Sequence, residues 1–263
     1  MNKVILITGG TSGIGLCTAK ILTEQGCTVY ELSRRNNGTD TAIHIQADVT
    51  DERQVQSAIS QILQLEGHLD VVINNAGFGI SGAIEFTETE DAIKQFDVNF
   101  FGMVRVNRAV LSVMREQGYG RILNMSSVAA PIAIPFQAYY SASKAAILTY
   151  TMALYNEVKP FGIEVCAILP GDVSTGFTSA RKKSALGDVV YGGRIMRSVA
   201  VMEHDEQSGI PAEKAGTFVA QKALRKKIPV KCTLGGKYKA FVFLTRLLPN
   251  RFLLDLVGKI YAS

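Results

Sequence analysis

The sequence predicts an α/β fold in which a doubly wound parallel sheet of about seven strands carries helices on both faces. Short apolar runs alternate with segments of helical apolar spacing, which is the pattern of consecutive β-α-β units. The chain has 263 residues, 47% of them hydrophobic, so it can bury a sizeable core, and we interpret residues 1–263 as a single domain. Ligands of such sheets bind at the carboxyl ends of the strands, so the residues after each strand are the candidate site.

The first strand, Lys3–Thr8, leads into a glycine-rich loop and then into a helix over Leu16–Gln25. Glycine lets the backbone approach a pyrophosphate, and the N-terminus of the following helix offers free N–H groups and a favourable dipole. A tight turn between strand and helix is the alternative, because the spacing differs from the usual G-x-G-x-x-G pattern. The candidate cofactor-binding residues of the loop are Gly9, Thr11, Ser12, Gly13, Ile14 and Gly15.

The second strand, Thr28–Ser33, ends in Ser33, Arg34 and Arg35 without an acidic residue. An acid at this point would bind the ribose hydroxyls of a dinucleotide, whereas an arginine accommodates a 2′-phosphate. Ser33, Arg34 and, with less weight, Arg35 therefore favour NADP(H), with NAD(H) as the alternative. A solvated pair of loop arginines would give the same sequence.

Two further loops carry candidate contacts to the cofactor. After a third strand at Ala42–Gln46, Asp48 can accept a hydrogen bond from adenine beside Val49, and Thr50 can cap a helix over Asp51–Leu65. A fourth strand, at residues 69–73, ends in small and amide residues that suit a loop against a flat ligand, although an Asx-turn explains the asparagine equally. The candidates there are Asn75, Ala76 and Gly77.

The fifth strand, Arg121–Met125, and the helix that we expect over Gln137–Lys159 carry an acid/base candidate. Tyr140 and Lys144 are four residues apart and share one helix face. A phenol has a pKa of about 10. A fixed cation nearby favours the phenolate and so moves this pKa toward neutral pH, where the group can act as an acid or base. Chance occurrences of Tyr-x-x-x-Lys are common, so the pair gains its meaning from the other motifs.

A helical region over residues 89–117 holds Asn99 in an apolar segment, where an asparagine is unfavourable unless its side chain has a function. Ser127 lies thirteen residues before Tyr140, and a sixth strand at residues 163–169 ends in Pro170-Gly171. Over roughly residues 3–178, these motifs together closely resemble the short-chain dehydrogenase/reductase family. The motifs that fall in family order and spacing are Thr8-Gly9-x-x-x-Gly13-Ile14-Gly15, Asn74-Asn75-Ala76-Gly77, Asn99, Ser127, Tyr140-x-x-x-Lys144 and Pro170-Gly171-x-x-x-Thr175.

The resemblance implies a Rossmann-like fold and hydride transfer between a nicotinamide and a carbonyl or carbinol carbon. It assigns proton transfer to Tyr140, a hydrogen bond to the substrate oxygen to Ser127, and a lowered Tyr140 pKa and a grip on the nicotinamide ribose to Lys144. Asn99 would hold a water that links Lys144 to solvent. The residues implied to position the nicotinamide are Pro170, Gly171, Val173 and Thr175.

One departure concerns the cofactor, because many NADP-using members carry a basic residue where this chain has Ser12. The strand tips and catalytic motifs look like the hydroxysteroid and retinol dehydrogenase branch. We expect a hydrophobic, lipid-like ketone or alcohol such as a steroid, a retinoid or a long-chain keto compound, because no charged side chain adjoins Ser127 or Tyr140 in sequence. The candidate substrate-binding residues are Phe78, Val128, Ile134, Phe136, Tyr139 and Phe177.

After residues 1–178, which form the cofactor-binding and catalytic core, we expect a substrate lid over residues 179–210 and a C-terminal region over residues 211–263. This region begins with a helix and an edge strand and carries 11 Lys/Arg against two acids. Its amphipathic tail, residues 238–261, is interrupted at Pro249 and is too short and too charged to span a bilayer. The tail could contact a membrane surface, cap the pocket or form an oligomer contact, and packing or oligomerisation is the simpler interpretation.

Composition excludes several classes of protein. The four cysteines have no metal or disulfide spacing, the three histidines have no metal-ligand spacing, and no signal peptide is evident, so we expect a cytoplasmic protein without a metal. No basic motif interleaved with aromatics suggests nucleic-acid binding. A homodimer or homotetramer is expected from the resemblance. The alternatives to a lipid-like substrate are reduction of small or 3-oxoacyl ketones and, from another class, an NADP(H)-sensing regulator without turnover.

Overall fold

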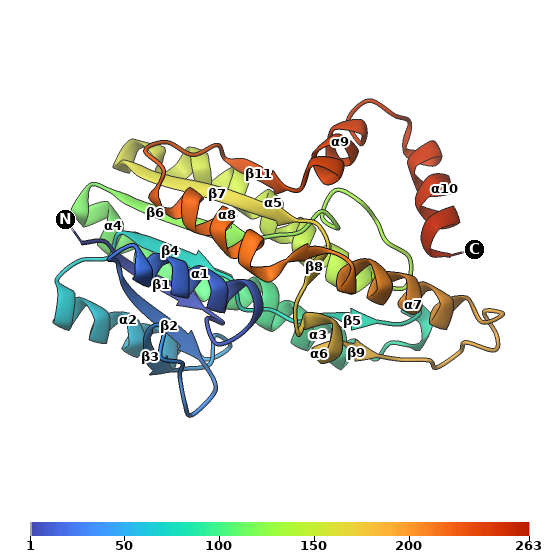
Figure 1. Ribbon diagram of the computed structural model, residues 1–263, viewed down its shortest axis with the longest axis horizontal. Coiled ribbons are helices and arrows are strands. Elements are labelled where there is room, and N and C mark those ends of the chain that lie inside the picture. Colours follow the sequence, from blue (N-terminus) through green and yellow to red (C-terminus); the bar gives the residue numbers. More distant parts are fainter. Residues whose placement is uncertain (1, 263) are drawn as a thin grey trace.

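The centre of the molecule is a parallel sheet of seven strands in the order β11-β7-β6-β4-β1-β2-β3, as predicted for the α/β class (Figure 1). The computed structural model describes residues 2–262. The sheet strands are β1 (Val4–Thr8), β2 (Thr28–Ser33), β3 (Ile43–Gln46), β4 (Val71–Asn74), β6 (Gly120–Met125), β7 (Ile163–Pro170) and β11 (Lys231–Leu234). Two short pairs lie apart from it, β5 (Ile80–Ser81) with β9 (Lys182–Lys183) and β8 (Val173–Ser174) with β10 (Ile210–Pro211).

Helices cover both faces of this sheet. Helices α1 (Gly13–Glu24) and α8 (Ala212–Leu224) cover one face, and α2 (Glu52–Glu66), α4 (Gly102–Gln117) and α5 (Ala138–Val158) cover the other. The other helices are α3 (Thr89–Phe96), α6 (Phe177–Ala180), α7 (Arg194–Gln207), α9 (Gly236–Leu244) and α10 (Asn250–Tyr261). Short 3-10 turns, η1 (Ile84–Phe86) and η3 (Lys159–Phe161), precede α3 and follow α5. Within residues 2–262, no helix combines the length and the apolarity needed to cross a membrane.

Continuous apolar strands arise because each face of the sheet is buried under a different set of helices. In β1, Val4 and Leu6 belong to the core formed with α2, α4 and α5, whereas Ile5 and Ile7 belong to the core formed with α1 and α8. Side chains alternate across a strand, so a strand covered on both faces must be apolar at successive positions. Burial of each such side chain contributes about 1.5–3 kcal/mol, which holds β1 at the centre of the sheet.

The carboxyl ends of the central strands lie level with one another. Thr8 of β1 pairs with Asn74 of β4, which pairs with Asn124 of β6. A buried amide network continues from there, because Asn74 Nδ2 donates to Asn124 Oδ1 at 2.8 Å and Asn124 Nδ2 donates to Thr151 Oγ1 at 3.0 Å. This network joins the strand ends to α5 and so fixes the helix that carries the acid/base candidate.

Two helices differ from the sequence-based expectation. The helical region over residues 89–117 is interrupted by a π-helical segment, η2 (Asp97–Phe101), between α3 and α4. Helix α2 is capped by Asp51 rather than by Thr50, because the Asp51 carboxylate accepts hydrogen bonds from Arg53 N at 2.9 Å and Gln54 N at 3.1 Å. Thr50 instead bonds Asp48, whose Oδ1 accepts from the Thr50 amide and hydroxyl.

The predicted amphipathic tail folds as two separate helices, α9 and α10, in the red part of Figure 1. Helix α10 contacts α7: the Tyr261 hydroxyl donates to Asp205 at 3.2 Å, and Arg194 Nε donates to the Ala262 carbonyl at 2.6 Å. At the start of α9, Tyr238 is buried and its hydroxyl bonds Asp172. The tail therefore packs against the predicted lid and the end of the sheet.

Candidate active site

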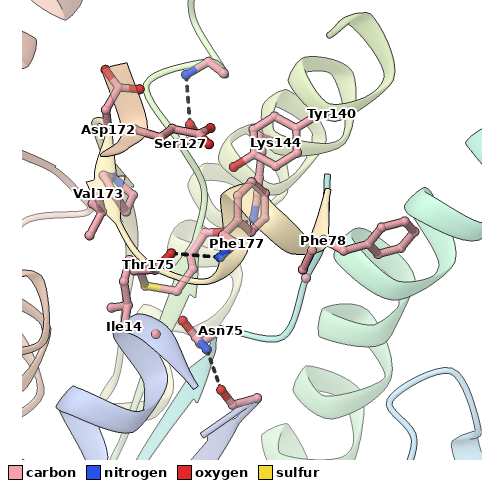
Figure 2. A pocket seen from close by; sticks show the side chains of 18 of the residues that line it. Ile14, Asn75, Phe78, Ser127, Tyr140, Lys144, Asp172, Val173, Thr175 and Phe177 are labelled. Atoms are coloured by element: carbon pink, nitrogen blue, oxygen red, sulfur yellow. Dashed lines mark hydrogen bonds between the residues drawn. The ribbon is translucent and has the colours of Figure 1, made fainter. Parts of the chain in front are cut away.

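A cavity of about 610 Å³ lies at the carboxyl ends of β1, β4, β6 and β7 (Figure 2). Its wall includes these predicted site residues: Gly9, Ser12, Gly13, Ile14, Arg35, Asn75, Ala76, Gly77, Phe78, Ser127, Val128, Ile134, Tyr140, Lys144, Pro170, Gly171, Val173, Thr175 and Phe177. Nine other predicted residues lie outside the wall: Thr11, Gly15, Ser33, Arg34, Asp48, Val49, Asn99, Phe136 and Tyr139. The topology thus brings most of the predicted set into one cavity.

The glycine-rich loop leaves room for a ligand against its backbone. Gly9 and Gly13 have φ of +67° and +53°, which disfavour other residues, and a Cβ on Gly9 would lie 3.0 Å from the Ala76 Cα. A Cβ on Gly15 would lie 2.4 Å from the Gly9 carbonyl oxygen, so Gly15 allows the helix to start close behind the loop. Ser12 makes no side-chain cap at the start of α1. Such a cradle of uncapped N–H groups fits the pyrophosphate of a dinucleotide.

Asn75 ties the β4 loop to the glycine-rich loop. Its Nδ2 donates to the Gly9 carbonyl at 3.0 Å and to the Thr8 carbonyl at 3.2 Å. In return, the Thr8 hydroxyl accepts from the amides of Asn75 and Ala76, each at 3.0 Å. The Asn75 side chain therefore bonds the neighbouring strand end, as Figure 2 shows, and not its own loop as in an Asx-turn.

The loops after β2 and β3 form the end of the site that would hold adenosine. Arg35 lies on the cavity wall, whereas the Arg34 side chain is 69% exposed and its guanidinium lies 4.0 Å from Asp48. The buried Ser33 hydroxyl has no hydrogen-bond partner among the described residues. A hydroxyl without a partner beside two arginines fits an additional ligand group at this position.

Ser127, Tyr140 and Lys144 meet on the wall between β6 and α5. Figure 2 shows Tyr140 and Lys144 projecting from one helix, with Ser127 on the facing loop. Lys144 Nζ donates to the Met125 carbonyl at 2.8 Å and lies 5.6 Å from the centroid of the Tyr140 ring. Ser127 Oγ accepts a hydrogen bond from the Ala129 amide at 3.1 Å. The Ser126 hydroxyl donates to the Lys144 carbonyl and so ties the loop after β6 to α5.

Burial dominates the protonation of this pair. It raises the pKa of Tyr140 to about 12, which is opposite to the lowered pKa expected from Lys144, and the hydrogen bond with Ser127 opposes the rise. Burial likewise lowers the pKa of Lys144 to about 8. At neutral pH the residues therefore hold a protonated phenol beside an ammonium, the state that can donate a proton to a substrate oxygen.

Asn99 acts on the wall from behind it. In the π-helical segment η2, its Oδ1 accepts from the Phe78 amide at 2.9 Å and its Nδ2 donates to the Phe78 carbonyl at 3.0 Å. Gly77 fits between Asn99 and Lys144, because a Cβ there would lie 3.1 Å from Asn99 Oδ1 and 3.7 Å from Lys144 Nζ. Asn99 thus fixes the β4 loop at the position where that loop meets Lys144.

The apolar part of the wall is formed by some of the predicted substrate contacts. The Phe177 ring lies 5.7 Å from the Tyr140 ring, and Val128 and Ile134 complete this side, whereas the Phe78 ring points away from Tyr140 in Figure 2. Phe136 turns instead toward the Tyr191 ring, 5.8 Å away, with an unusual φ of 57° for a residue with a side chain.

Acidic groups also reach the wall, although no charged residue adjoins the catalytic motifs in sequence. Asp172 and Glu206 are both wall residues. The position of Asp172 directly after Pro170-Gly171 was a signal that could have found it, whereas Glu206 lies in α7 and nothing in the sequence connects it to the site. The other wall residues that sequence reasoning missed are Met125, Ser126, Ala129, Gln137, Gly176, Ser179 and Ala180.

Comparison with known proteins identifies the family. A family model described as short chain dehydrogenase matches residues 3–185. The chain is 41% identical to the 3-ketodihydrosphingosine reductase of Bacteroides thetaiotaomicron over 236 residues, which cover 89% of this chain and 88% of that protein. A short-chain dehydrogenase from Streptomyces avermitilis has the same fold, with a TM-score of 0.85 and 30% identity over 98% of this chain and 97% of that one. The chain belongs to the short-chain dehydrogenase/reductase family and is an oxidoreductase.

Two structural relatives carry nicotinamide cofactors. ElxO with NADP bound has a TM-score of 0.76 and 26% identity, covering 91% of this chain and all 100% of that one. A 3-ketoacyl-(acyl-carrier-protein) reductase from Brucella melitensis, complexed with NADH, has a TM-score of 0.75 and 26% identity, covering 90% and 98% of the two chains. This fold therefore holds either NADP or NADH in related proteins.

Proposed function

We propose that this protein is an NADP(H)-dependent oxidoreductase that interconverts a carbonyl and a secondary alcohol on a hydrophobic, lipid-like substrate. The observation that supports it most directly is one cavity in which the Ser127–Tyr140–Lys144 group, an apolar wall and the glycine cradle are continuous. Among a steroid, a retinoid and a long-chain keto compound, the last is favoured. The relative at 41% identity bears a name that specifies a long-chain ketone as its substrate.

In the proposed mechanism, the glycine-rich loop and the residues after β7 would hold a nicotinamide cofactor, which would supply hydride for the carbonyl carbon. Ser127 donates a hydrogen bond that holds the carbonyl oxygen, and Tyr140 transfers its proton to that oxygen as negative charge develops there. Lys144 stabilises the phenolate left behind, since its ammonium lies 5.6 Å from the ring centroid. Asn99 keeps the Phe78 backbone, and with it the loop beside Lys144, in place.

NADP(H) is the cofactor that we propose, with NAD(H) as the alternative. The strand tip carries Ser33, Arg34 and Arg35, and no acidic residue that would repel a 2′-phosphate. Arg35 on the wall and the exposed Arg34 both lie near enough to the tip of β2 to reach such a group, and the partnerless Ser33 hydroxyl would donate to it. The remaining predicted contacts, Thr11, Gly15, Asp48 and Val49, would act from the layer behind the wall.

Reduction of small or 3-oxoacyl ketones is the second candidate, because a structural relative at 26% identity is named a 3-ketoacyl-(acyl-carrier-protein) reductase. The regulator without turnover is set aside, since the chain belongs to a family of oxidoreductases.

The organisation of the chain is also a proposal: a single domain with a core of residues 1–178 and a lid of residues 179–210, in a protein located in the cytoplasm. A homodimer or homotetramer is also proposed, for which η2 and α5 expose the apolar Phe101 and Met152.

The tail suits peripheral contact with an anionic bilayer. Phe243 and Leu247, near the end of α9, and Phe252 and Leu254 of α10 are 55–65% exposed. Basic side chains accompany them along residues 237–259, with Asp255 as the one acid in that stretch. Apolar side chains together with a basic surplus are the combination that binds to the surface of anionic membranes.

The proposed activity is tested by following NADPH oxidation with purified protein and a panel of ketones. The panel contains long-chain 3-keto compounds, steroid ketones and retinal, each in detergent, and small soluble keto esters. We expect turnover of the long-chain ketones with NADPH in preference to NADH. Turnover of the small keto esters at a higher kcat/KM would favour the second candidate, and absence of turnover on the whole panel would contradict the proposal.

A further inference from the structure

The cavity wall next to the catalytic pair carries two carboxylates that the proposed mechanism does not use. Asp172 follows β7 and Glu206 lies in α7, and both line the same 610 Å³ cavity as Ser127 and Tyr140. The two carboxylates are also close enough to Tyr140 for their charges to raise its pKa. Carboxylates are rarely taken out of water unless a cation or several donors compensate them, so each one calls for a partner.

Glu206 has its partner within the protein. Its Oε2 accepts from the Thr178 hydroxyl at 2.7 Å, and its Oε1 forms an ion pair with Arg181. The Arg181 side chain is fully buried, and its guanidinium lies 5.6 Å from the Phe177 ring centroid. The charge of Glu206 is therefore neutralised by the lid, and the pair holds Phe177 in the wall.

Asp172 has no such cation. Its carboxylate bonds the hydroxyl of Tyr238, a neutral donor, and among residues 2–262 no Lys, Arg or His forms a salt bridge with it. The nearby Lys237 ammonium lies over the Tyr238 ring, 4.6 Å from its centroid. Burial raises the pKa of Asp172 and the charge of Asp205 adds to the rise, whereas the hydrogen bond from Tyr238 and the charge of Lys237 oppose it without cancelling it. A cation that entered the cavity would relieve this penalty.

The position of Asp172 relative to the reacting group is fixed by the backbone. The Val128 amide, next to Ser127, donates to the Pro170 carbonyl at 3.0 Å, so the loop with Ser127 lies against the loop with Asp172. Figure 2 shows Asp172 and Ser127 on the same side of the cavity. The Tyr238 ring packs directly on Gly171, since a Cβ there would lie 2.1 Å from Tyr238 Cδ2. An ammonium held by Asp172 would thus stand close to a carbonyl held by Ser127.

We propose that Asp172 is a specificity-determining residue that binds the ammonium of an amino ketone, in which the amine lies on the carbon next to the carbonyl. The inference rests on the proposed function, because it concerns the substrate of that same cavity. The apolar wall of Val128, Ile134 and Phe177 would bind the hydrocarbon chain of the substrate, and Asp172 would bind its charged end. A long-chain ketone without an amine would leave the partly buried Asp172 carboxylate with the Tyr238 hydroxyl but without a cation.

The test compares 3-ketodihydrosphingosine, a long-chain ketone with an amine beside the carbonyl, with its analogue of equal chain length that lacks the amine. The variants are Asp172→Asn, which removes the charge and keeps an oxygen acceptor for Tyr238, and Asp205→Asn, which removes a neighbouring negative charge that does not line the cavity. NADPH oxidation gives kcat/KM for each pair, and thermal melting with NADPH binding verifies that each variant is folded.

We expect the unmodified protein to have a higher kcat/KM for 3-ketodihydrosphingosine than for the analogue. Asp172→Asn should lower kcat/KM for 3-ketodihydrosphingosine by about 10- to 100-fold, mainly by raising KM, because a charged hydrogen bond is lost. The same variant should not lower kcat/KM for the analogue by more than about 3-fold, because it removes a carboxylate that the analogue leaves without a cation. Asp205→Asn should change kcat/KM for either ketone by less than about 3-fold. Equal losses on both ketones, or no preference in the unmodified protein, would overturn the role of Asp172 and leave the proposed function intact. Absence of turnover on both ketones would overturn the two together.

Discussion

The Lys144 ammonium lies 5.6 Å from the centroid of the Tyr140 ring, on the same face of α5, and burial moves the pKa values of the two groups in opposite senses, that of Tyr140 to about 12 and that of Lys144 to about 8. Both shifts favour the neutral form, because both side chains have lost water. At neutral pH the phenol is neutral in any case, so the cost in stability falls on the Lys144 ammonium.

That cost predicts a pH dependence of stability. The folded pKa of Lys144 lies below its ordinary value of 10.5, so the unfolded chain binds more protons between about pH 8 and pH 10 and stability rises with pH there. Lys144→Met removes this contribution. We expect the stability of the unmodified protein relative to Lys144→Met to increase on the order of 2 kcal/mol from pH 8 to pH 10 in urea unfolding. If the free energy of unfolding changed with pH equally in the unmodified protein and in Lys144→Met, the Lys144 ammonium would not be desolvated.

The arginines after β2 predict the cofactor preference. Arg34→Ala and Arg35→Ala together should raise the Kd for NADPH by about 10- to 100-fold, because charged hydrogen bonds to a 2′-phosphate are lost, and should leave the Kd for NADH within about 3-fold. Quenching of NADPH and NADH fluorescence on titration measures both constants. The single variants separate the exposed Arg34 from Arg35 on the cavity wall. Equal weakening of the two cofactors would exclude recognition of the 2′-phosphate by this pair.

Asn99 is predicted to act through the β4 loop. Asn99→Ala would leave the part-buried Phe78 amide without the acceptor it has at 2.9 Å, whereas the Phe78 carbonyl would keep the hydrogen bond that Gln95 Nε2 donates at 3.1 Å. We expect a loss of about 1–3 kcal/mol in the free energy of unfolding, together with a lower kcat. Asn99→Asp keeps the acceptor for the Phe78 amide and should recover part of that stability. Unchanged stability in Asn99→Ala would show that the loop does not depend on this side chain.

The tail predicts binding to anionic vesicles. The protein should sediment with vesicles of phosphatidylcholine and phosphatidylglycerol and remain in solution with phosphatidylcholine vesicles. Replacing Phe252 and Leu254 by Ser should abolish sedimentation, since both side chains are more than half exposed and contribute little to the fold. Sedimentation that is equal for both lipid mixtures, or equal in the variant, would contradict a surface contact made through α10.

Most of the residues that follow β1, β4 and β7 on the cavity wall could be predicted from the sequence, whereas most of those predicted after β2 and β3 lie outside the wall. A strand buried on both faces, such as β1, is recognised in the sequence as a continuous apolar run, so the loop that follows it is located as well. The Tyr140–Lys144 pair could be predicted because both residues are on one helix, where spacing fixes geometry. The π-helical segment at Asn99 has no sequence signal except the polar residue in an apolar helix.

The residues that sequence reasoning missed come from distant elements. Glu206 reaches the cavity because α7 lies over β8, a packing that depends on the whole lid. Phe136 was expected in the pocket because it lies between Ser127 and Tyr140, but its positive φ turns the side chain toward Tyr191. Neighbours in sequence point in different directions where a loop turns sharply, and no spacing rule predicts which side chain faces the cavity.

The most direct test of the account is the kcat of Tyr140→Phe for NADPH-dependent reduction of a long-chain ketone, with Tyr155→Phe on the same helix as the matched control. The change removes one hydroxyl from the cavity wall and should lower kcat by about 100- to 10,000-fold, the range for loss of a general acid. NADPH binding and thermal stability should be retained, and Tyr155→Phe should keep its activity. Substantial activity in Tyr140→Phe would contradict the assignment of the proton donor and, with it, the mechanism proposed for this cavity.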